Sequence, residues 1–212
     1  MKLSRGEFDQ RYRDGTLRLA LVGMSNIGKS YSGMRLATDY DFTLIEVDRL
    51  IWAALGESDM DAFAAWQGQP YTDGYEARER RSIALETDAT RRSLETNARN
   101  PLLDTTGSVI YTDADVLDRL RRDWFIVYIE AADNHLDRLK SQYFAQPKPL
   151  AWNGHYERQS GLSDTESLMA CYPKLLAARA DAYAALADRT VSSEDILTND
   201  KSRLFDLVKP TR

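Results

Sequence analysis

The sequence has few of the residues that bind metals or form disulfides. Cys171 is the one cysteine, and two histidines occur in 212 residues. One cysteine cannot form an intrachain disulfide, and zinc sites built from thiolates need several. The chain also lacks a hydrophobic signal core near its start, and no apolar run reaches the length that spans a membrane. We therefore expect a cytoplasmic protein with no membrane partner.

Positive charge is scarce as well. Lysine and arginine number 28 against 33 aspartates and glutamates, which leaves a net charge of −5. Binding of nucleic acid without sequence preference needs a basic surface, so we expect no nucleic-acid partner. The hydrophobic fraction of 43% suffices for one core. We expect a single domain over residues 1–212, and the sequence leaves the oligomeric state open.

One stretch near the start carries a specific chemical pattern. Apolar residues at 17, 19, 21 and 22 predict a buried strand, and residues 23–30 then read G-x-x-x-x-G-K-S. Residues 31–39 can continue as a helix. This is the pattern of a phosphate-binding loop (P-loop) between a strand and a helix, in which main-chain N–H groups surround a phosphate. It predicts binding of ATP with Mg²⁺.

Each position of this loop has an expected role. Lys29 is predicted to reach the terminal phosphates, and the hydroxyl of Ser30 is predicted to bind Mg²⁺. The nucleotide contacts are expected from Gly23, Asn26, Ile27, Gly28, Lys29, Ser30 and Tyr31.

Acidic residues end the second predicted strand, residues 41–48. Glu46 and Asp48 are two positions apart, so on an extended backbone they face the same side of the sheet. Ligands of open α/β sheets bind at the carboxyl ends of strands. We therefore expect one or both to act in the site; a solvated acidic strand end is the alternative.

Residues 49–97 are predicted to be helical and highly charged, with a break at 68–74 that contains two glycines. Most of these charges are expected to form a solvated face. One or two of Arg78, Arg80 and Arg81 are candidates for a substrate cleft, and the sequence does not choose among them.

A third strand is predicted at residues 100–104, and it ends in Asp104. Small and hydroxyl-bearing residues follow it, Thr105, Thr106 and Gly107. This arrangement is typical of a carboxylate that positions a metal, followed by a tight turn facing the substrate. An ordinary strand and turn is the alternative interpretation.

The rest of the chain alternates between helices and strands. Helices are predicted at 113–122, 133–143, 168–187 and 202–208, and strands at 124–129 and 189–192. A short helix or arm is expected at 4–16. Between them, prolines on both sides of Lys148 predict a loop at 145–154 that presents this cation from a mobile segment.

The ordered set of these motifs resembles shikimate kinase and its relatives in the nucleoside monophosphate kinase group. The motifs are residues 23–30, 48–51, 104–108 and 148–150, and Arg179 with Tyr183. The resemblance implies the P-loop NTPase fold, an α/β fold with a five-stranded parallel sheet flanked by helices. It also implies a helical substrate-binding segment at about 49–99 and a lid at about 141–165.

Site roles follow from the resemblance position by position. Asp48 is implied to contact the acceptor hydroxyl, Arg179 to bind an anionic group of the substrate, and Lys148 to replace the arginine of the family's lid. Thr106 and Gly107 take part of a substrate turn that has three glycines in the family. The family's further arginine between these motifs has no clean match, so an acceptor of different shape is expected to be possible.

The function expected from these observations is transfer of the γ-phosphoryl group of ATP to a hydroxyl of a small, anionic metabolite. Lys29, Asp48 and Lys148 are the predicted catalytic residues, and Ser30 with Glu46 or Asp104 is predicted to hold Mg²⁺. Three alternatives stay open: a kinase of another small acceptor, a nucleotide-binding regulatory protein without transfer activity, and an ATP hydrolase.

Overall fold

The computed structural model describes residues 1–56, 60–145, 150–198 and 203–211. Its sheet has five strands in the order β2-β3-β1-β4-β5, and every pairing is parallel. The fold predicted from the sequence is thus confirmed. The strands are β1 Leu19–Val22, β2 Thr43–Glu46, β3 Pro101–Asp104, β4 Phe125–Glu130 and β5 Arg189–Ser192.

The central strands are apolar because both of their faces are covered. Every residue of β1 and β3 is buried, and so are the first five residues of β4. A strand covered on both faces reads as a continuous hydrophobic run, as these do. The chain moves from β3 across β1 to β4, which makes the carboxyl end of β1 the point where the winding reverses. The P-loop begins at that end.

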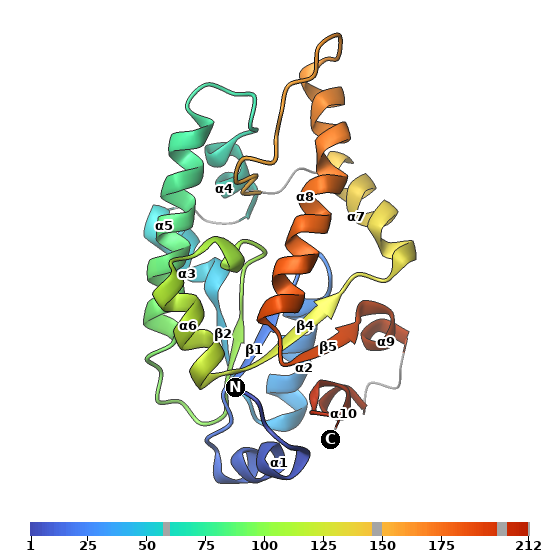
Figure 1. Ribbon diagram of the computed structural model, residues 1–212. Coiled ribbons are helices and arrows are strands. Elements are labelled where there is room, and N and C mark those ends of the chain that lie inside the picture. The colour runs from blue at the N-terminus through green and yellow to red at the C-terminus, as the bar shows by residue number, and fades with distance from the viewer. Residues whose placement is uncertain (57–59, 146–149, 199–202, 212) are drawn as a thin grey trace.

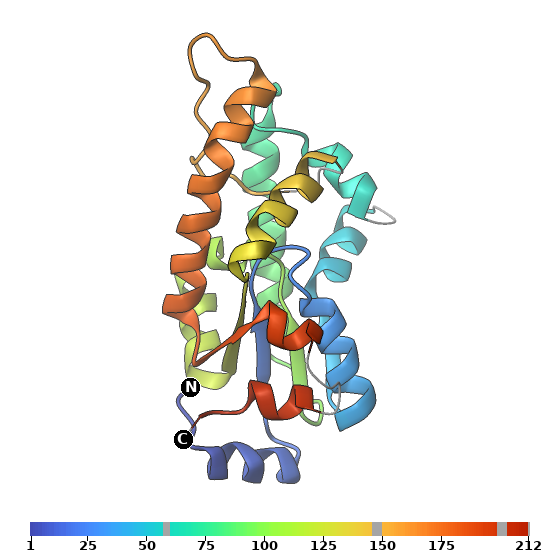
Figure 2. The same ribbon diagram turned by 90° about the vertical axis from the view of Figure 1, so that its right-hand side faces the viewer.

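Helices surround this sheet and extend above it. They are α1 Arg5–Asp14, α2 Lys29–Tyr40, α3 Val47–Leu55, α4 Met60–Gln67, α5 Tyr75–Ser93, the 3₁₀ helix η1 Val109–Tyr111, α6 Ala114–Asp123, α7 Asp133–Ala145, α8 Asp164–Leu186, α9 Ser193–Thr198 and α10 Leu204–Val208. Figure 2 shows α2 on one face of the sheet and α6 with the lower part of α8 on the other. Above the carboxyl edge stand α4, α5, α7 and the upper part of α8 (Figure 1).

The second strand is shorter than predicted. It ends at Glu46, and Asp48 already lies in the first turn of α3. Val47 and Ile51 are both buried, and α3 packs against α5, so burial of this i, i+4 pair favours a helix here. The prediction that Glu46 and Asp48 share one face of an extended strand was wrong.

Two helices differ from the predicted boundaries for identifiable reasons. The long C-terminal helix starts at Asp164 rather than 168, because Ser163 caps it and the Glu166 carboxylate accepts a hydrogen bond from the Ser163 N–H. The short helix α9, which follows β5 directly, was not predicted. The predicted break at 68–74 is present, with positive φ at Gly68 and Gly74. Among the described residues, no helix is long and apolar enough to cross a membrane.

Candidate active site

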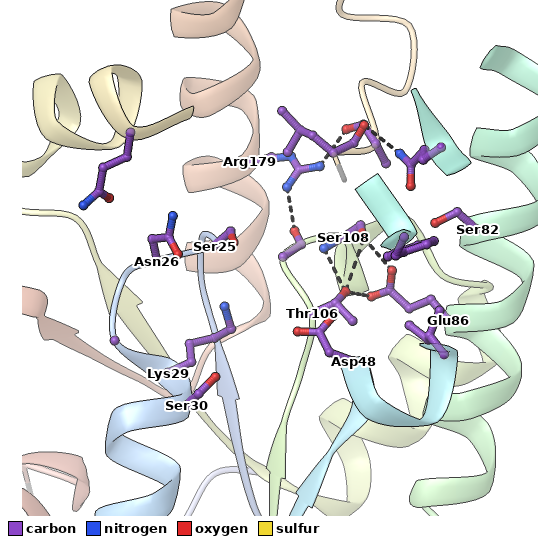
Figure 3. A pocket seen from close by; sticks show the side chains of 18 of the residues that line it. Ser25, Asn26, Lys29, Ser30, Asp48, Ser82, Glu86, Thr106, Ser108 and Arg179 are labelled. Atoms are coloured by element: carbon purple, nitrogen blue, oxygen red, sulfur yellow. Dashed lines mark hydrogen bonds between the residues drawn. The ribbon is translucent and has the colours of Figure 1, made fainter. Parts of the chain in front are cut away.

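A pocket of about 630 Å³ opens at the carboxyl edge of the sheet. Figure 3 shows Ser25, Asn26, Lys29 and Ser30 on one side of it, which we call the P-loop side. The opposite wall we call the α5 side; it consists of Asp48, Ser82, Glu86, Thr106, Gly107, Ser108 and Arg179. The two sides face each other across the space where β1 and β3 end.

The P-loop has the glycine conformations that its pattern requires. Gly23 has φ +145°, and a Cβ there would lie 2.7 Å from the carbonyl oxygen of Ile129, so no other residue fits without a shift. Gly28 has φ +106° and forms the N-cap of α2 without a side-chain cap. The N–H groups of the first turn of α2 are therefore directed to the pocket and not to a capping side chain.

Lys29 is buried at the base of this loop. Its Nζ donates hydrogen bonds to the carbonyl oxygens of Gly23 at 3.0 Å and Met24 at 2.9 Å. Burial lowers the pKa of Lys29, and the negative charges of Asp104 and Asp48 oppose that effect. The carbonyl groups of the P-loop thus hold the ammonium group of Lys29 in place.

Asp104 and Ser30 fit a Mg²⁺ site. Asp104 is 5% exposed at the end of β3, and its Oδ1 accepts no hydrogen bond from the described part of the chain. Burial raises the pKa of Asp104, whereas the charge of Lys29 and a hydrogen bond from Ser30 lower it. A buried carboxylate oxygen with no donor, next to a hydroxyl at a P-loop, matches the oxygen ligands that Mg²⁺ prefers.

Glu46 lies beside Asp104 in the strand register but is engaged elsewhere. Its Oε2 is 2.9 Å from the Nε of Arg49 in a half-exposed ion pair, and Glu46 does not line the pocket. Of the two carboxylates predicted as metal ligands, Asp104 is therefore the better placed. No group of three or more acidic, histidine or cysteine residues that could hold a metal occurs in the described ranges.

Glu86 is a central residue of the α5 side that sequence analysis missed. It is 1% exposed, and it accepts hydrogen bonds from the hydroxyls of Thr106 and, at 2.5 Å, of Ser108. Burial raises its pKa to about 7, although those two hydrogen bonds lower it. The expectation that most charges of 49–97 are solvated does not hold for this residue, because α5 turns its Ser82 and Glu86 into the pocket.

Arg179 enters the pocket from α8. The resemblance implied that it binds an anionic group of the substrate, and that role stays a prediction. Arg179 is 2% exposed; its Nη1 donates to the carbonyl oxygen of Gly107 at 2.9 Å and its Nη2 to that of Ala151 at 2.6 Å. Its guanidinium carbon lies 5.2 Å from the ring centre of Tyr111. The side chain thus connects the turn after β3 to the segment that precedes α8.

The arginines at the start of α5 do not reach the pocket. Arg78 donates to the carbonyl oxygens of Gln67 and Asp73, Arg80 lies 3.8 Å from Glu76 in an exposed pair, and Arg81 is exposed. None of the three lines the pocket described here. Another arginine, Arg138 of α7, lines the pocket instead.

Arg138 lines the pocket from α7 together with Gln142 and Ala145. The α7 ribbon lies on the same side of the pocket as the P-loop (Figure 3). A smaller hollow, lined by Asn26 of the P-loop and Leu139 of α7, lies between the loop and the helix. The spacing i, i+4, i+7 places these three residues on one helical face, a signal that the sequence contained.

The predicted lid is described in part. Lys148 lies outside the described residues, and 141–145 are the end of α7. Beyond the gap, Leu150 accepts hydrogen bonds from Gln67 and Tyr75, and Trp152, 1% exposed, donates its N–H to Glu79. The Asn153 N–H donates to the same Glu79 carboxylate at 2.9 Å. Residues 150–153 are thus attached to α4 and α5.

Comparison with known proteins gives one consistent picture. No family model matches the sequence. The chain is 25% identical over 194 residues to a protein named shikimate kinase from Hahella chejuensis, which covers 92% of this chain and 85% of that relative. The shikimate kinase from Acinetobacter baumannii in complex with shikimate matches with a TM-score of 0.60 at 17% identity, over 92% of this chain and 91% of that one.

A second solved structure agrees. The shikimate kinase from Bacteroides thetaiotaomicron matches with a TM-score of 0.58 at 18% identity, over 91% of this chain and 94% of that one. The resemblance to shikimate kinase is confirmed. This chain has the shikimate kinase fold with a pocket at its carboxyl edge.

Most residues that the resemblance to shikimate kinase singled out come together. The predicted nucleotide and substrate residues that line the pocket are Asn26, Gly28, Lys29, Ser30, Tyr31, Asp48, Thr106, Gly107 and Arg179. Gly23 and Ile27 belong to the same loop, but they are buried and do not line the pocket. Ser82, Glu86, Arg138 and Gln142 line the pocket and were not predicted. The catalytic and binding roles of all these residues stay predictions.

Proposed function

We propose that the protein is an ATP-dependent kinase that transfers the γ-phosphoryl group to a hydroxyl of a small metabolite. The observation that carries this proposal is the shared pocket: a complete P-loop with its buried lysine faces a polar wall that contains Asp48. The fold and the sequence similarity to a shikimate kinase support it. The name of that relative does not identify the acceptor of this chain, so the acceptor here is inferred from this chain's own residues.

The P-loop side is proposed to bind and orient the triphosphate. Main-chain N–H groups at the start of α2 and the ammonium group of Lys29 compensate the phosphate charge. Mg²⁺, held by Ser30 and Asp104, would neutralise charge on the β- and γ-phosphates. Arg138 from α7 adds a cation that can reach the same end of the pocket.

The α5 side is proposed to hold the acceptor. Asp48 lies in the first turn of α3 and lines the pocket, where it can orient an acceptor hydroxyl and take its proton. In the transfer, the hydroxyl oxygen forms a bond to the γ-phosphorus, the bond from that phosphorus to the β,γ-bridging oxygen breaks, and ADP leaves. The two sides supply positioning and charge rather than covalent chemistry.

Acceptor-dependent release of ADP tests the proposal. The purified protein is incubated with ATP, Mg²⁺ and hydroxylated metabolites one at a time, and ADP and the phosphorylated product are both quantified. A kinase releases ADP in proportion to phosphorylated product. Equal ADP release with and without any acceptor would identify an ATP hydrolase, and ATP binding without ADP release would identify a nucleotide-binding regulatory protein.

A further inference from the structure

The guanidinium of Arg179 has donors left for a ligand. Its two Nη groups each donate to one main-chain carbonyl, those of Gly107 and Ala151, and these bonds use two of its five N–H groups. Its Nε is buried and has no hydrogen-bond partner among the described residues. A buried donor without an acceptor costs free energy, so a ligand that supplies an acceptor is favoured. Since Arg179 lines the pocket, an anionic group of the ligand suits it best.

Glu86 offers the opposite charge on the same wall. Its carboxylate accepts one hydrogen bond at each oxygen, from the hydroxyl of Thr106 and, at 2.5 Å, from that of Ser108. A carboxylate oxygen can accept two hydrogen bonds, so each oxygen of Glu86 has a second position for a donor. Glu86 lines the pocket although it is 1% exposed. A ligand group at this place is therefore expected to be a hydrogen-bond donor.

The described part of the chain supplies no cation that pairs with Glu86. Both of its hydrogen bonds come from uncharged hydroxyls, and no ion pair between described residues includes it. The three arginines at the start of α5 do not line the pocket, and Lys29 donates to carbonyls of the P-loop.

The charges around Glu86 leave this carboxylate without compensation. Burial raises its pKa to about 7, and the charge of Asp48 raises that pKa by more than the charge of Arg179 lowers it. Buried charges in proteins are normally paired. A cationic group on the ligand would supply the missing partner, and an ammonium group would fill a free acceptor position of the carboxylate at the same time.

One short turn holds the two charged groups near each other. Arg179 donates to the carbonyl of Gly107, and Glu86 accepts from the residues on either side of that glycine, Thr106 and Ser108. Figure 3 shows Ser108 between Arg179 and Glu86. Both side chains are thus fixed to a segment of three residues. A small compound with an anionic and a cationic group a few atoms apart can contact both.

We infer that the acceptor is a zwitterion, a hydroxy amino acid or an amino-substituted sugar acid, whose anionic group binds Arg179 and whose ammonium group binds Glu86. This inference rests on the proposed kinase function, and it adds a positive group to the anionic acceptor that the resemblance implied. A zwitterion brings no net charge to a wall that faces the triphosphate, whereas a simple anion adds repulsion. Glu86 is then a specificity-determining residue, and Asp48 keeps its proposed role at the reacting hydroxyl.

Sets of related compounds test the inference. L-Homoserine is compared with 4-hydroxybutyrate, which lacks the ammonium group, and with 3-aminopropan-1-ol, which lacks the carboxylate. L-Threonine, 3-hydroxybutyrate and 1-aminopropan-2-ol form a second set, and D-glucosaminate is paired with D-gluconate. We measure kcat/KM at pH 8, where Glu86 is mostly ionised and the ammonium groups are still protonated. In the best set the zwitterion is expected to be favoured by about tenfold or more over each counterpart, because each counterpart leaves one buried charge unpaired.

The outcomes separate this inference from the kinase function. A preference below about tenfold over either counterpart would overturn the inference and leave the kinase function standing. So would a screen of hydroxylated metabolites in which the best acceptor has no ammonium group. No acceptor-dependent ADP release with any compound, those of the screen included, would contradict the kinase function itself.

Glu86→Gln tests which residue binds the ammonium group. Glutamine keeps the shape but carries no charge, so the preference for the zwitterion over the counterpart without an ammonium group should fall by about tenfold. The preference over the counterpart without a carboxylate depends on Arg179 and should change less; a general loss of packing would not separate the two. Glu76→Gln is the matched control, because Glu76 is exposed on the same helix. Unchanged preferences would overturn the assignment to Glu86. If Glu86→Gln does not fold, the wild-type comparisons still decide the inference.

Discussion

The two sides of the pocket are built from the chain in different ways. Apart from the α7 residues Arg138, Gln142 and Ala145, the P-loop side comes from one stretch, residues 25–31, in which each residue's position follows from the turn between β1 and α2. The α5 side takes residues from α3, α5, the turn after β3 and α8, which are up to 131 positions apart, from 48 to 179. Chemistry that depends on a local backbone shape is therefore encoded locally, whereas acceptor recognition depends on how distant segments pack.

Loss of the Lys29 charge is expected to have the largest effect and tests the P-loop side alone. Lys29→Ala removes the ammonium group at the phosphates, so kcat is expected to fall by about a thousandfold or more while the protein stays folded. ADP release and the melting temperature are measured together. Lys174→Ala, on the exposed face of α8, is the control. Undiminished turnover in folded Lys29→Ala would contradict the proposed function.

Asp104→Asn is expected to have the next largest effect. The carboxylate is buried beside Lys29, and its Oδ1 lacks a donor among the described residues. The half-saturating Mg²⁺ concentration is expected to rise by about 10- to 100-fold. A titration of activity against Mg²⁺ measures this, with Asp118→Asn on the exposed face of α6 as control. An unchanged Mg²⁺ requirement would leave the P-loop side without its assigned metal ligand.

Sequence analysis predicted the P-loop side better than the α5 side, because a local pattern is visible in the sequence and the packing of distant segments is not. Lys29, Ser30 and Asp104 were found because each ends or follows a strand whose hydrophobic pattern is visible. Glu86 was missed because α5 is charged along its whole length. Which carboxylate of such a helix is buried depends on what packs there, here Thr106 and Ser108, some 20 residues further along the chain.

The sheet itself was predictable, and the details around it were less so. All five strands were predicted, and β1, β3 and β4 are buried runs that are apolar because both of their faces are covered. The start of α3 at Val47 was not, because its contact with α5 decided between strand and helix. The helix cap at Ser163 was readable as S-x-x-E and was overlooked.

Arg179→Lys tests whether the α5 side depends on long-range connections. Lysine cannot donate to the carbonyls of Gly107 and Ala151 at once with the same geometry. The turn after β3 and residues 150–153 should therefore lose the side chain that connects them. We expect kcat/KM for the acceptor to fall by about 10- to 100-fold while ATP affinity changes little. Separate titrations of ATP and acceptor measure this, with exposed Arg81→Lys as control. Equal weakening of both would mean that the two sides are not independent.

The smallest expected effect concerns the charge of Glu86 and appears in stability. Burial raises the pKa of Glu86 from 4.5 to about 7 in the folded protein. Between these values the folded state keeps a proton that the unfolded state releases, so the stabilisation is complete below about pH 4.5 and is lost as pH rises to about 7. Relative to Glu86→Gln, which does not titrate, the wild-type free energy of unfolding should fall by up to about 3 kcal/mol across this window.

Chemical unfolding at pH 4.5 and pH 8 measures this difference, and groups common to both proteins cancel in the comparison. Glu76→Gln, exposed on the same helix, is expected to follow the wild type at both pH values. If wild type and Glu86→Gln differ by the same free energy at both, the pKa of Glu86 is the same in the folded and the unfolded protein, and Glu86 is more hydrated than its contacts with Thr106 and Ser108 indicate. A wild-type protein that gains stability with pH relative to Glu86→Gln would mean that these hydrogen bonds outweigh burial, the reverse of what its raised pKa predicts.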